Sequence, residues 1–376
     1  MRKSWKISVW LAIALMAPSA VMAEDQAGES PPWSAARITQ ALDQLLRDAV
    51  SHDALQRPDG CVYAIDLTGM MLLAVETADQ DLYRRLEEKA VTHLLVHDPS
   101  DPLTDGMVAW RYRPGESLDA SGTTEALRLA EALWRADALF NRPTDRDLAV
   151  LILHAYARHA VVDQDIWLIR NYFNLQTRAF ATNSYLVDYD PDLLAKVAKD
   201  TGDAMLADMA ERSASLVRKA IAPCGLLHEI VQPEVLTLMP TLPGAGGSVA
   251  FSPNDIIHLG NSATVARGVA KSAPEIGRGV LAFAIARLPD LRVHYLGRTG
   301  EKASADDDWA GGDVLAALVL LADELGDRSA VERLRPFLLG KAQNFAEHPG
   351  EPRVYQTTFL LRAMDAVSRA APPAKD

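Results

Sequence analysis

Apolar residues at helical spacing run through almost the whole chain, and this pattern most narrows the folds open to it. Twelve segments follow the 3.6-residue period, whereas strand-like alternation is scarce. In order they form six pairs. The expected helices span residues 34–50, 66–78, 80–97, 120–140, 145–160, 184–199, 203–221, 255–271, 274–288, 309–325, 328–340 and 353–369.

The segments are of two kinds that alternate along the chain. "DLYRRLEEKAVTHLL" and "AMLADMAERSASLVRKA" have one charged face, whereas "TGMMLLAVETA" and "GGDVLAALVLLADEL" are apolar or small around most of their circumference. An amphipathic helix lies at a surface, and a helix that is apolar all round is buried. The alternation therefore predicts an all-α (α/α)6 barrel with an inner and an outer ring. An open superhelix of helix pairs is the alternative, but no strict repeat supports it.

The first 23 residues have the layout of a secretory signal peptide. "MRKSWKISVWLAIALMAPSAVMA" has a basic start, an apolar stretch and a small residue, Ala23, before Glu24. The apolar stretch is too short for a comfortable membrane span, and no later stretch is long enough. We therefore expect residues 24–376 to form one barrel domain in the periplasm or outside the cell, with no membrane span after cleavage.

Charge and cysteine content exclude several classes of partner. The formal net charge is −12, and loss of Arg2, Lys3 and Lys6 with the leader gives −12 − 3 = −15. Such a surface disfavours nucleic acids and anionic membranes.

Cys61 and Cys224 could pair after export or remain two buried thiols. There is no CxxC motif, His/Cys cluster, calcium loop or phosphate loop, so we expect neither a metal nor another cofactor. Oligomeric state is not indicated.

The entries to the inner segments share a polar chemistry. They read "YAIDLTG", "LDASGTTE", "ATNSYLVDYD", "SPNDIIH", "ADDDWAGGD" and "PRVYQTT". Side-chain oxygens there can satisfy free N–H groups at a helix start, and acids meet the positive helix end. In a toroid these entries converge at one end of the barrel, so the same residues could form a carboxylate-rich pocket.

Aromatic residues gather near the same entries and near two long connections, 98–118 and 222–254, the second of which should contain a short hairpin. Rings with an apolar face and a polar edge suit sugars, although each could instead fill the core. A polysaccharide or oligosaccharide is therefore the expected partner. The candidate substrate-binding residues are Trp110, Tyr112, Tyr172, Asn183, Tyr185, His258 and Trp309.

Four stretches resemble, in order, motifs of the family 8 glycoside hydrolases, which are inverting enzymes on (α/α)6 barrels that cleave β-1,4-glucans and related polymers. They are "TGMMLLAVETADQDLYRRL", "DGMVAWRYRPGESLDASGTTEALRLAEALWRAD", "TNSYLVDYDPDLLAKVAKDTGD" and "SPNDIIHLG". "GGDVLAALVLLADEL" follows in the expected place. The resemblance implies the barrel fold and a glycosidase activity on a β-linked polysaccharide.

The resemblance also shows where this chain departs from the family. The family's general acid falls on Ile65, with Asp66 next to it. Its substrate-distorting Asp falls on Thr124, beside Glu125, while its catalytic base falls on Asp255. One residue along a helix turns a side chain by about 100°.

The resemblance therefore implies Asp255 as base and either Asp66 or Glu125 as acid. Inversion places the two carboxyl groups roughly 6.5–9.5 Å apart. Asp119, in the loop before the helix, is a fourth catalytic candidate. A structural role for Glu125, paired with Arg128 at i+3, is the alternative.

Two other functions fit the same barrel. A polysaccharide lyase would neutralise a uronate and use Tyr or His as base and acid. Its candidates are Arg170, Asn171, Tyr172, Arg178, Asn183, Tyr185, His228 and His258. A non-catalytic glycan-binding or export component is the third possibility, because Ile65 stands where the acid should be. The discriminating feature is whether any carboxyl reaches that position.

The leader makes a direct prediction. The exported protein should begin at Glu24, because signal peptidase cleaves after a small residue that follows the apolar stretch. Mass spectrometry of protein recovered from periplasm or medium measures this terminus. An intact Met1 on the exported chain would contradict the leader assignment.

Overall fold

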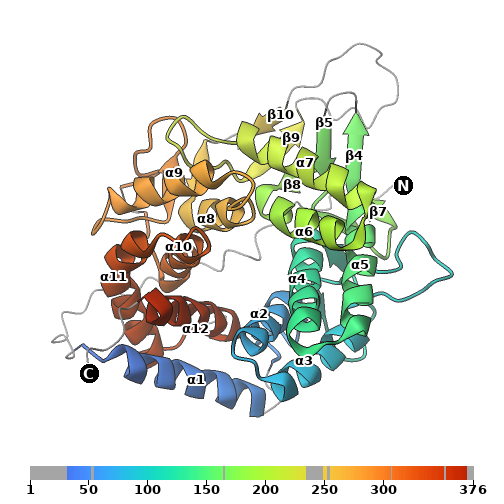
Figure 1. The fold of residues 1–376 in the computed structure, drawn as a ribbon, viewed down its shortest axis with the longest axis horizontal. Coiled ribbons are helices and arrows are strands. Elements are labelled where there is room, and N and C mark those ends of the chain that lie inside the picture. The colour runs from blue at the N-terminus through green and yellow to red at the C-terminus, as the bar shows by residue number, and fades with distance from the viewer. Residues whose placement is uncertain are drawn as a thin grey trace, which may run out of the picture. The chain divides into compact units, whose positions relative to one another are not determined.

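Twelve α-helices form two concentric rings in the described part of the unit Ser34–Asp376 (Figure 1). The inner ring consists of α2 (Ala64–Glu76), α4 (Thr123–Phe140), α6 (Pro191–Thr201), α8 (Leu259–Arg267), α10 (Gly312–Glu324) and α12 (Arg353–Ala370). The outer ring consists of α1 (Ala35–Ser51), α3 (Gln80–His93), α5 (Pro143–Ala157), α7 (Ala204–Lys219), α9 (Pro274–Ile285) and α11 (Arg328–Glu347). The predicted (α/α)6 barrel is confirmed.

This computed structural model describes residues 32–51, 55–163, 166–233, 249–251, 255–305, 307–350 and 353–370. The predicted signal peptide, residues 1–23, lies outside the described residues. Cys61 and Cys224 are free thiols. Within the described ranges, no helix has both the length and the apolar character that a membrane crossing requires.

Burial separates the two rings as the hydrophobic pattern predicts. Helix α2 buries 11 of its 13 residues, whereas α3 buries only Tyr83, Leu86 and Ala90 of its 14. Helix α10 is equally enclosed, with an unbroken buried run from Val314 to Ala322. The inner helices thus supply most of the core, while the outer helices cover it with one apolar face each.

Short strands precede four of the inner helices, and they explain why some predicted helix starts were too early. Helix α4 follows β3 (Ala120–Gly122), and α8 follows β11 (Ile256–His258). Helix α6 follows β8 (Ser184–Tyr185) and a 3-10 turn, Leu186–Asp188, so it starts seven residues later than predicted. Strands of two or three residues are too short to show an alternating pattern.

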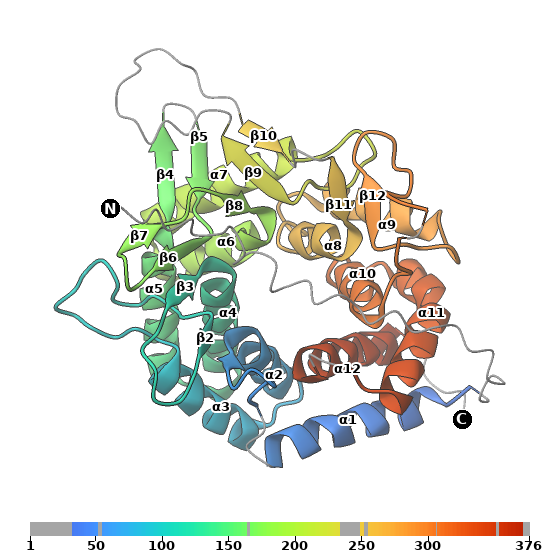
Figure 2. The ribbon, with the colours of Figure 1, turned by 180° about the vertical axis from the view of Figure 1, so that it is seen from behind.

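Each entry strand pairs antiparallel with a strand from a neighbouring loop. Strand β1 (Val62–Tyr63) pairs with β2 (Arg111–Tyr112), β3 with β6 (Tyr172–Asn174), and β11 with β12 (His294–Leu296). Strand β8 joins the hairpin of β9 (Ile230–Pro233) and β10 (Val249–Phe251), as predicted within 222–254. Two further pairs complete the set: β6 with β7 (Ala179–Phe180), and β4 (Ala160–Asp163) with β5 (Ile166–Ile169). Figure 2 shows most of these strands on one face of the ring.

Charged side chains cross the bore between α2, α4 and α12. The Arg362 guanidinium donates two hydrogen bonds of 2.8 Å to Glu76, and Arg135 bridges Glu76 at 3.1 Å and Glu131 at 3.2 Å. Burial disfavours the ionised form of Glu76, but Arg362 and Arg135 outweigh it and hold its pKa below the ordinary value. Glu131 and Arg135 are thus compatible with an inner helix, because Arg135 pairs with Glu131 and, across the bore, with Glu76 of α2.

Removing one member of this network should be costly. Glu76→Gln leaves the buried Arg362 without its carboxylate, so we expect the free energy of unfolding to fall by about 3 kcal/mol. Chemical denaturation measures the change. The matched control, Asp208→Asn, breaks an exposed pair with Arg212 and should cost less than about 1 kcal/mol. Equal losses in both variants would contradict a structural role for the network.

Candidate active site

A continuous set of polar side chains follows the N-terminal ends of α4, α6, α8 and α10. Each member lies within hydrogen-bonding, ring-contact or electrostatic reach of the next. We call it the polar rim: Glu125, Asp188, Tyr185, Glu229, His258, His294, Asp307, Arg292 and Trp309. It contains three of the residues expected to bind substrate and one of the four expected catalytic carboxyls.

Asp66 lies in the first turn of α2 but is fully engaged with a cation. Its side chain is 1% exposed and accepts hydrogen bonds of 2.8 and 3.0 Å from Arg57. Arg57 in turn stacks over Tyr63 at 4.0 Å. Ile65, at the family's acid position, is also buried. The Arg57 guanidinium thus occupies both oxygens of this carboxylate.

Asp119 organises the approach to α4 but does not cap the helix. Its carboxylate accepts hydrogen bonds from Trp110 Nε1 at 2.8 Å, the Ala120 N–H at 2.8 Å and Arg111 at 3.2 Å. The capping residue is Gly122, which has no side chain to contribute. Side-chain capping of the inner helices occurs at α6 and α8, through Asp190 and His258, and is absent at α2, α4 and α10.

Glu125 folds back from the first turn of α4 over its own entry strand. A Cβ on Gly122 would lie 1.9 Å from Glu125 Oε2, so only glycine leaves room for this carboxyl. Burial raises the pKa of Glu125, and Arg128 only partly offsets it. The two side chains form no ion pair within 4 Å, so the predicted i+3 pairing is absent. Glu125 retains some accessible surface, which leaves a protonatable carboxyl at the rim.

Asp188 is a second buried carboxyl at the same place, and it was not singled out from the sequence. It accepts hydrogen bonds from Thr124 Oγ1 at 2.7 Å and from the Tyr185 N–H at 3.1 Å. Burial, reinforced by the negative charge of Glu125, raises its pKa to about 7. The sequence signal was the entry "ATNSYLVDYD", in which Asp188 resembled an ordinary helix-start residue.

Asp255 lies apart from the other three candidates. It has a left-handed backbone, with φ of 55°, and its carboxylate accepts the Arg298 N–H at 3.2 Å and faces Arg298 Nε at 3.7 Å. Its side chain is 27% exposed, so water can reach it. No recorded contact joins it to Asp66, Asp119 or Glu125.

The aromatic candidates divide between packing and open positions. Trp110 lies under Arg111 and meets Tyr63 edge-on, and Tyr112 stacks on His93 at 4.6 Å. Trp309 differs, because it is 48% exposed and only one of its faces carries a partner, Arg292 at 3.6 Å. Trp309 is thus the clearest open aromatic surface at the rim.

The centre of the rim combines tyrosine, histidine and carboxylate side chains. Tyr185 lies within electrostatic reach of Tyr172 and Glu229, and burial raises its pKa. A hydrogen bond from Asn183 acts in the opposite direction. Glu229 Oε1 accepts a bond of 2.7 Å from Asn261.

Two histidines face each other across the strand pair that leads into α8, His258 in β11 and His294 in β12. The His258 and His294 rings meet edge to face at 5.2 Å, and burial lowers the pKa of His258. His294 Nδ1 lies 2.9 Å from Asp307 Oδ1. His294 was missed because it stands at no motif position, and Asp307 was not singled out within the polar entry "ADDDWAGGD". Within the described residues, no three His, Cys, Asp or Glu side chains are grouped so as to hold a metal ion.

The cations proposed for a lyase are engaged elsewhere. Arg170 donates to the carbonyls of Arg158 and His159 and stacks on Phe180 at 3.5 Å. Arg178 makes a bidentate pair with Asp101, at 2.7 and 3.0 Å. Neither guanidinium is available to neutralise a uronate in this arrangement.

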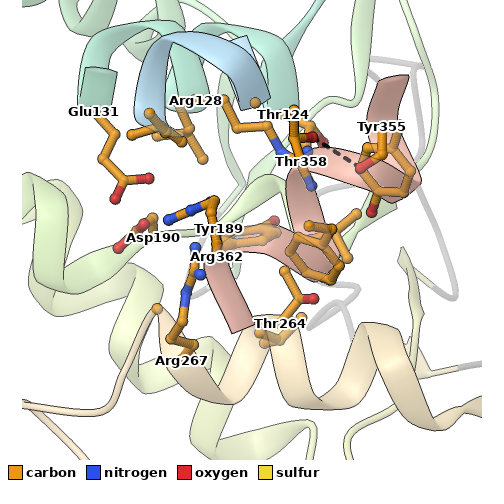
Figure 3. A pocket seen from close by; sticks show the side chains of 17 residues that line it. Thr124, Arg128, Glu131, Tyr189, Asp190, Thr264, Arg267, Tyr355, Thr358 and Arg362 are labelled. Carbon is orange, nitrogen blue, oxygen red and sulfur yellow. Dashed lines mark hydrogen bonds between the residues drawn. The ribbon is translucent and has the colours of Figure 1, made fainter. Parts of the chain in front are cut away.

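Below the rim, a narrow cavity of about 60 Å³ extends into the bore (Figure 3). Its walls come from α2, α4, α8, α12 and the segment before α6. Charged groups line it alongside Thr124, Tyr189 and Tyr355. An engineered cavity that holds benzene measures about 150 Å³, so this space is too small for a sugar ring.

Comparison with known proteins confirms the predicted likeness to family 8 glycoside hydrolases at the level of the fold. An α-amylase from Clostridium perfringens has a TM-score of 0.63 and 14% identity, covering 81% of this chain and 86% of its own. Rex8A from Paenibacillus barcinonensis, complexed with xylose, has a TM-score of 0.60 and 18% identity, and the match covers 92% of this chain and 96% of Rex8A. A mutant of a reducing-end-xylose-releasing exo-oligoxylanase has a TM-score of 0.59 and 16% identity, and the match covers 90% of this chain and 94% of that enzyme. No protein-family model and no curated protein matches the sequence.

The raised pKa of Asp188 sets the sign of a pH effect. An unfolded Asp188 ionises near 3.8, whereas the folded one keeps its proton until about pH 7. The folded state therefore binds the extra proton, and stability falls as pH rises between these values. Asp188→Asn cannot ionise, so its stability relative to wild type should rise through this window by about 4 kcal/mol.

Denaturation of both proteins at several pH values measures this difference. Asp101→Asn is the opposite-sign control, because Arg178 holds the pKa of Asp101 well below its ordinary range. That variant should lose stability relative to wild type as pH rises through about 4. A pH-independent difference between Asp188→Asn and wild type would show that the carboxyl ionises normally.

Proposed function

We propose that this chain is an exported glycosidase that hydrolyses a neutral β-linked glycan with inversion, using Glu125 as the proton donor. The observation that carries the proposal is the state of that carboxyl. It lies on the first turn of an inner helix, is half-buried without an ion pair within 4 Å, and has a raised pKa. A general acid must hold its proton near neutral pH, and desolvation of a carboxyl is the ordinary way to achieve this.

Asp255 is the proposed base. Its partial exposure gives water access to the carboxylate, and the Arg298 N–H fixes one oxygen. An inverting enzyme holds a water between its base and the sugar, on the face opposite the acid. The proposal therefore requires the Asp255 and Glu125 carboxyls to stand roughly 6.5–9.5 Å apart.

The polar rim offers the surface on which a glycan would lie. Trp309 presents a ring braced by Arg292, whose guanidinium is itself fixed by Asp290 and the Asp307 carbonyl. A rigid indole of this kind matches the apolar face of a pyranose. Tyr185, Asn183 and His258 add hydroxyl, amide and imidazole groups that can hydrogen-bond sugar hydroxyls.

The structural neighbours support the substrate class. Rex8A is complexed with xylose, and the exo-oligoxylanase has a variant complexed with xylobiose. Both are neutral sugars, and the acidic surface of this chain agrees with an uncharged substrate. We therefore propose a β-1,4-glucan-like polymer or a neutral exopolysaccharide as substrate. Periplasmic or extracellular location follows from the leader in the sequence.

A non-catalytic glycan-binding role is the second candidate, and one observation favours it. The family's acid position holds the apolar Ile65, and the adjacent Asp66 is tied to Arg57. A barrel that has lost its general acid keeps the polar rim and the exposed Trp309 ring, so it can still hold a glycan. The two candidates differ only in whether Glu125 transfers a proton.

Incubation with neutral β-glucans and xylo-oligosaccharides tests the choice. A hydrolase releases reducing ends, and NMR of the fresh product should show the α anomer. Glu125→Gln should lower kcat by at least about 100-fold, because an amide cannot donate the proton. The loss should be smallest on substrates with an activated leaving group. Asp255→Asn should lower kcat comparably and leave glycan binding intact.

Three controls complete the experiment. Glu116→Gln changes an exposed glutamate of the same kind and should keep full activity. Asp119→Asn reports whether that residue acts through structure alone, since an amide keeps most of its hydrogen bonds. A uronate polymer tests for the unsaturated product of a lyase. Glycan binding without any product, in wild type and variants alike, would replace the hydrolase with the binder.

A further inference from the structure

Strands β11 and β12 lie side by side at the entry to α8 (Figure 2). His258 and His294 stand directly opposite each other in this antiparallel pair, so their side chains project from the same face of the sheet. Arg292 precedes His294 by two residues and therefore shares that face. A further antiparallel bridge joins Arg292 to Trp309, and the guanidinium lies over the indole at 3.6 Å. The two histidines thus continue the surface on which the exposed Trp309 lies.

The backbone of α8 determines which nitrogen of His258 carries the proton. Nδ1 of this ring caps the helix by accepting the Asn261 N–H at 3.2 Å, and a backbone amide can only donate. In a neutral imidazole one ring nitrogen accepts and the other carries the proton. Nε2 of His258 is therefore an N–H donor.

Asp307 imposes the opposite arrangement on His294. One of its carboxylate oxygens accepts the backbone N–H of His294 at 2.7 Å, and the other lies 2.9 Å from Nδ1 of the same residue. An ionised carboxylate only accepts hydrogen bonds, so Nδ1 of His294 carries the proton and Nε2 is an acceptor. The Asp307 side chain is only 9% exposed, and both of its oxygens serve to orient His294.

The two rings therefore present a donor and an acceptor at short range. Their centroids are 5.2 Å apart, and within the described residues neither Nε2 has a hydrogen-bond partner or is sealed from solvent. A hydroxyl group both accepts and donates, and two hydrogen bonds of about 2.8 Å span such a gap. We propose that His258 and His294 together bind one free hydroxyl of a sugar unit, which makes His294 a specificity-determining residue. This inference rests on the proposed binding of a neutral glycan at the polar rim, but not on its hydrolysis.

A site of this kind selects among glycans by their substitution. A methyl ether at the bound position has no proton to give to His294 and adds bulk between the rings, so that sugar unit should be rejected. We expect unsubstituted β-1,4-xylo-oligosaccharides to bind at least about 10-fold more tightly than partially O-methylated ones. Isothermal titration with the Glu125→Gln protein, in which cleavage should be slow, measures both affinities.

Asp307→Asn tests how His294 is positioned. The amide oxygen must still accept the backbone N–H of His294, so the NH2 group faces Nδ1 and the ring proton moves to Nε2. Proton–nitrogen NMR at about pH 8, where an imidazole is ordinarily neutral, distinguishes the two tautomers without any glycan. Combined with Glu125→Gln, the substitution should weaken binding of the unsubstituted oligosaccharide about 10-fold. It should also remove most of the preference over the methylated form, because two N–H donors now face the ligand.

Asp308→Asn is the matched control, since it changes the next residue of the same loop, which is exposed. It should keep both the tautomers and the affinities of its parent. A wild-type His294 protonated on Nε2, or affinities that Asp307→Asn leaves unchanged, would overturn the inference and leave the proposed function standing. Failure of the wild type to bind any neutral glycan would overturn both, whereas binding without hydrolysis would refute the glycosidase and leave the hydroxyl site in place.

Discussion

A ring of six inner helices leaves a bore that must be filled, and here charged side chains fill much of it. The Glu76–Arg362 pair joins the first inner helix along the chain, α2, to the last, α12, and Arg135 and Glu131 extend the network to α4. Such a network is stable only if the ring stays closed and dry, because each ion relies on the others. The need to keep this network closed fixes the positions of α2, α4 and α12. It thereby fixes the depth of the bore below the polar rim.

The fold was predictable from the sequence because its signal is long and repeated. Twelve helices at a 3.6-residue period, alternating in amphipathicity, leave few architectures open. The helix starts were less accessible. At α6, the residues from Ser184 to Asp188 form a strand and a 3-10 turn, stabilised by pairing with β9 and by the Asp188 carboxylate. The pairing with β9 is tertiary, so local sequence could not reveal it.

The candidate site was predictable in kind but not in detail. Polar helix entries indicated a cluster of titratable groups at one end of the barrel, and Glu125 was among the residues named. Asp66 looked equivalent in the sequence, yet the structure ties it to Arg57, nine residues earlier and in a loop. Asp188 gained its unusual pKa from complete burial, and His294 gained its carboxylate partner from a turn 13 residues later. Environments of this kind arise from packing, which no short motif encodes.

The pairing of the entry strands has a consequence for how such a barrel can diversify. Strands β2, β6, β9 and β12 lie inside the loops that surround the mouth, and each is fastened by backbone hydrogen bonds to the start of an inner helix or its neighbour. Backbone pairing is indifferent to side-chain identity. The outward-facing positions of these loops can therefore be exchanged while the anchor points persist. The backbone frame is thus separate from the side chains that face outward, so a barrel of this kind can change those side chains without refolding its core.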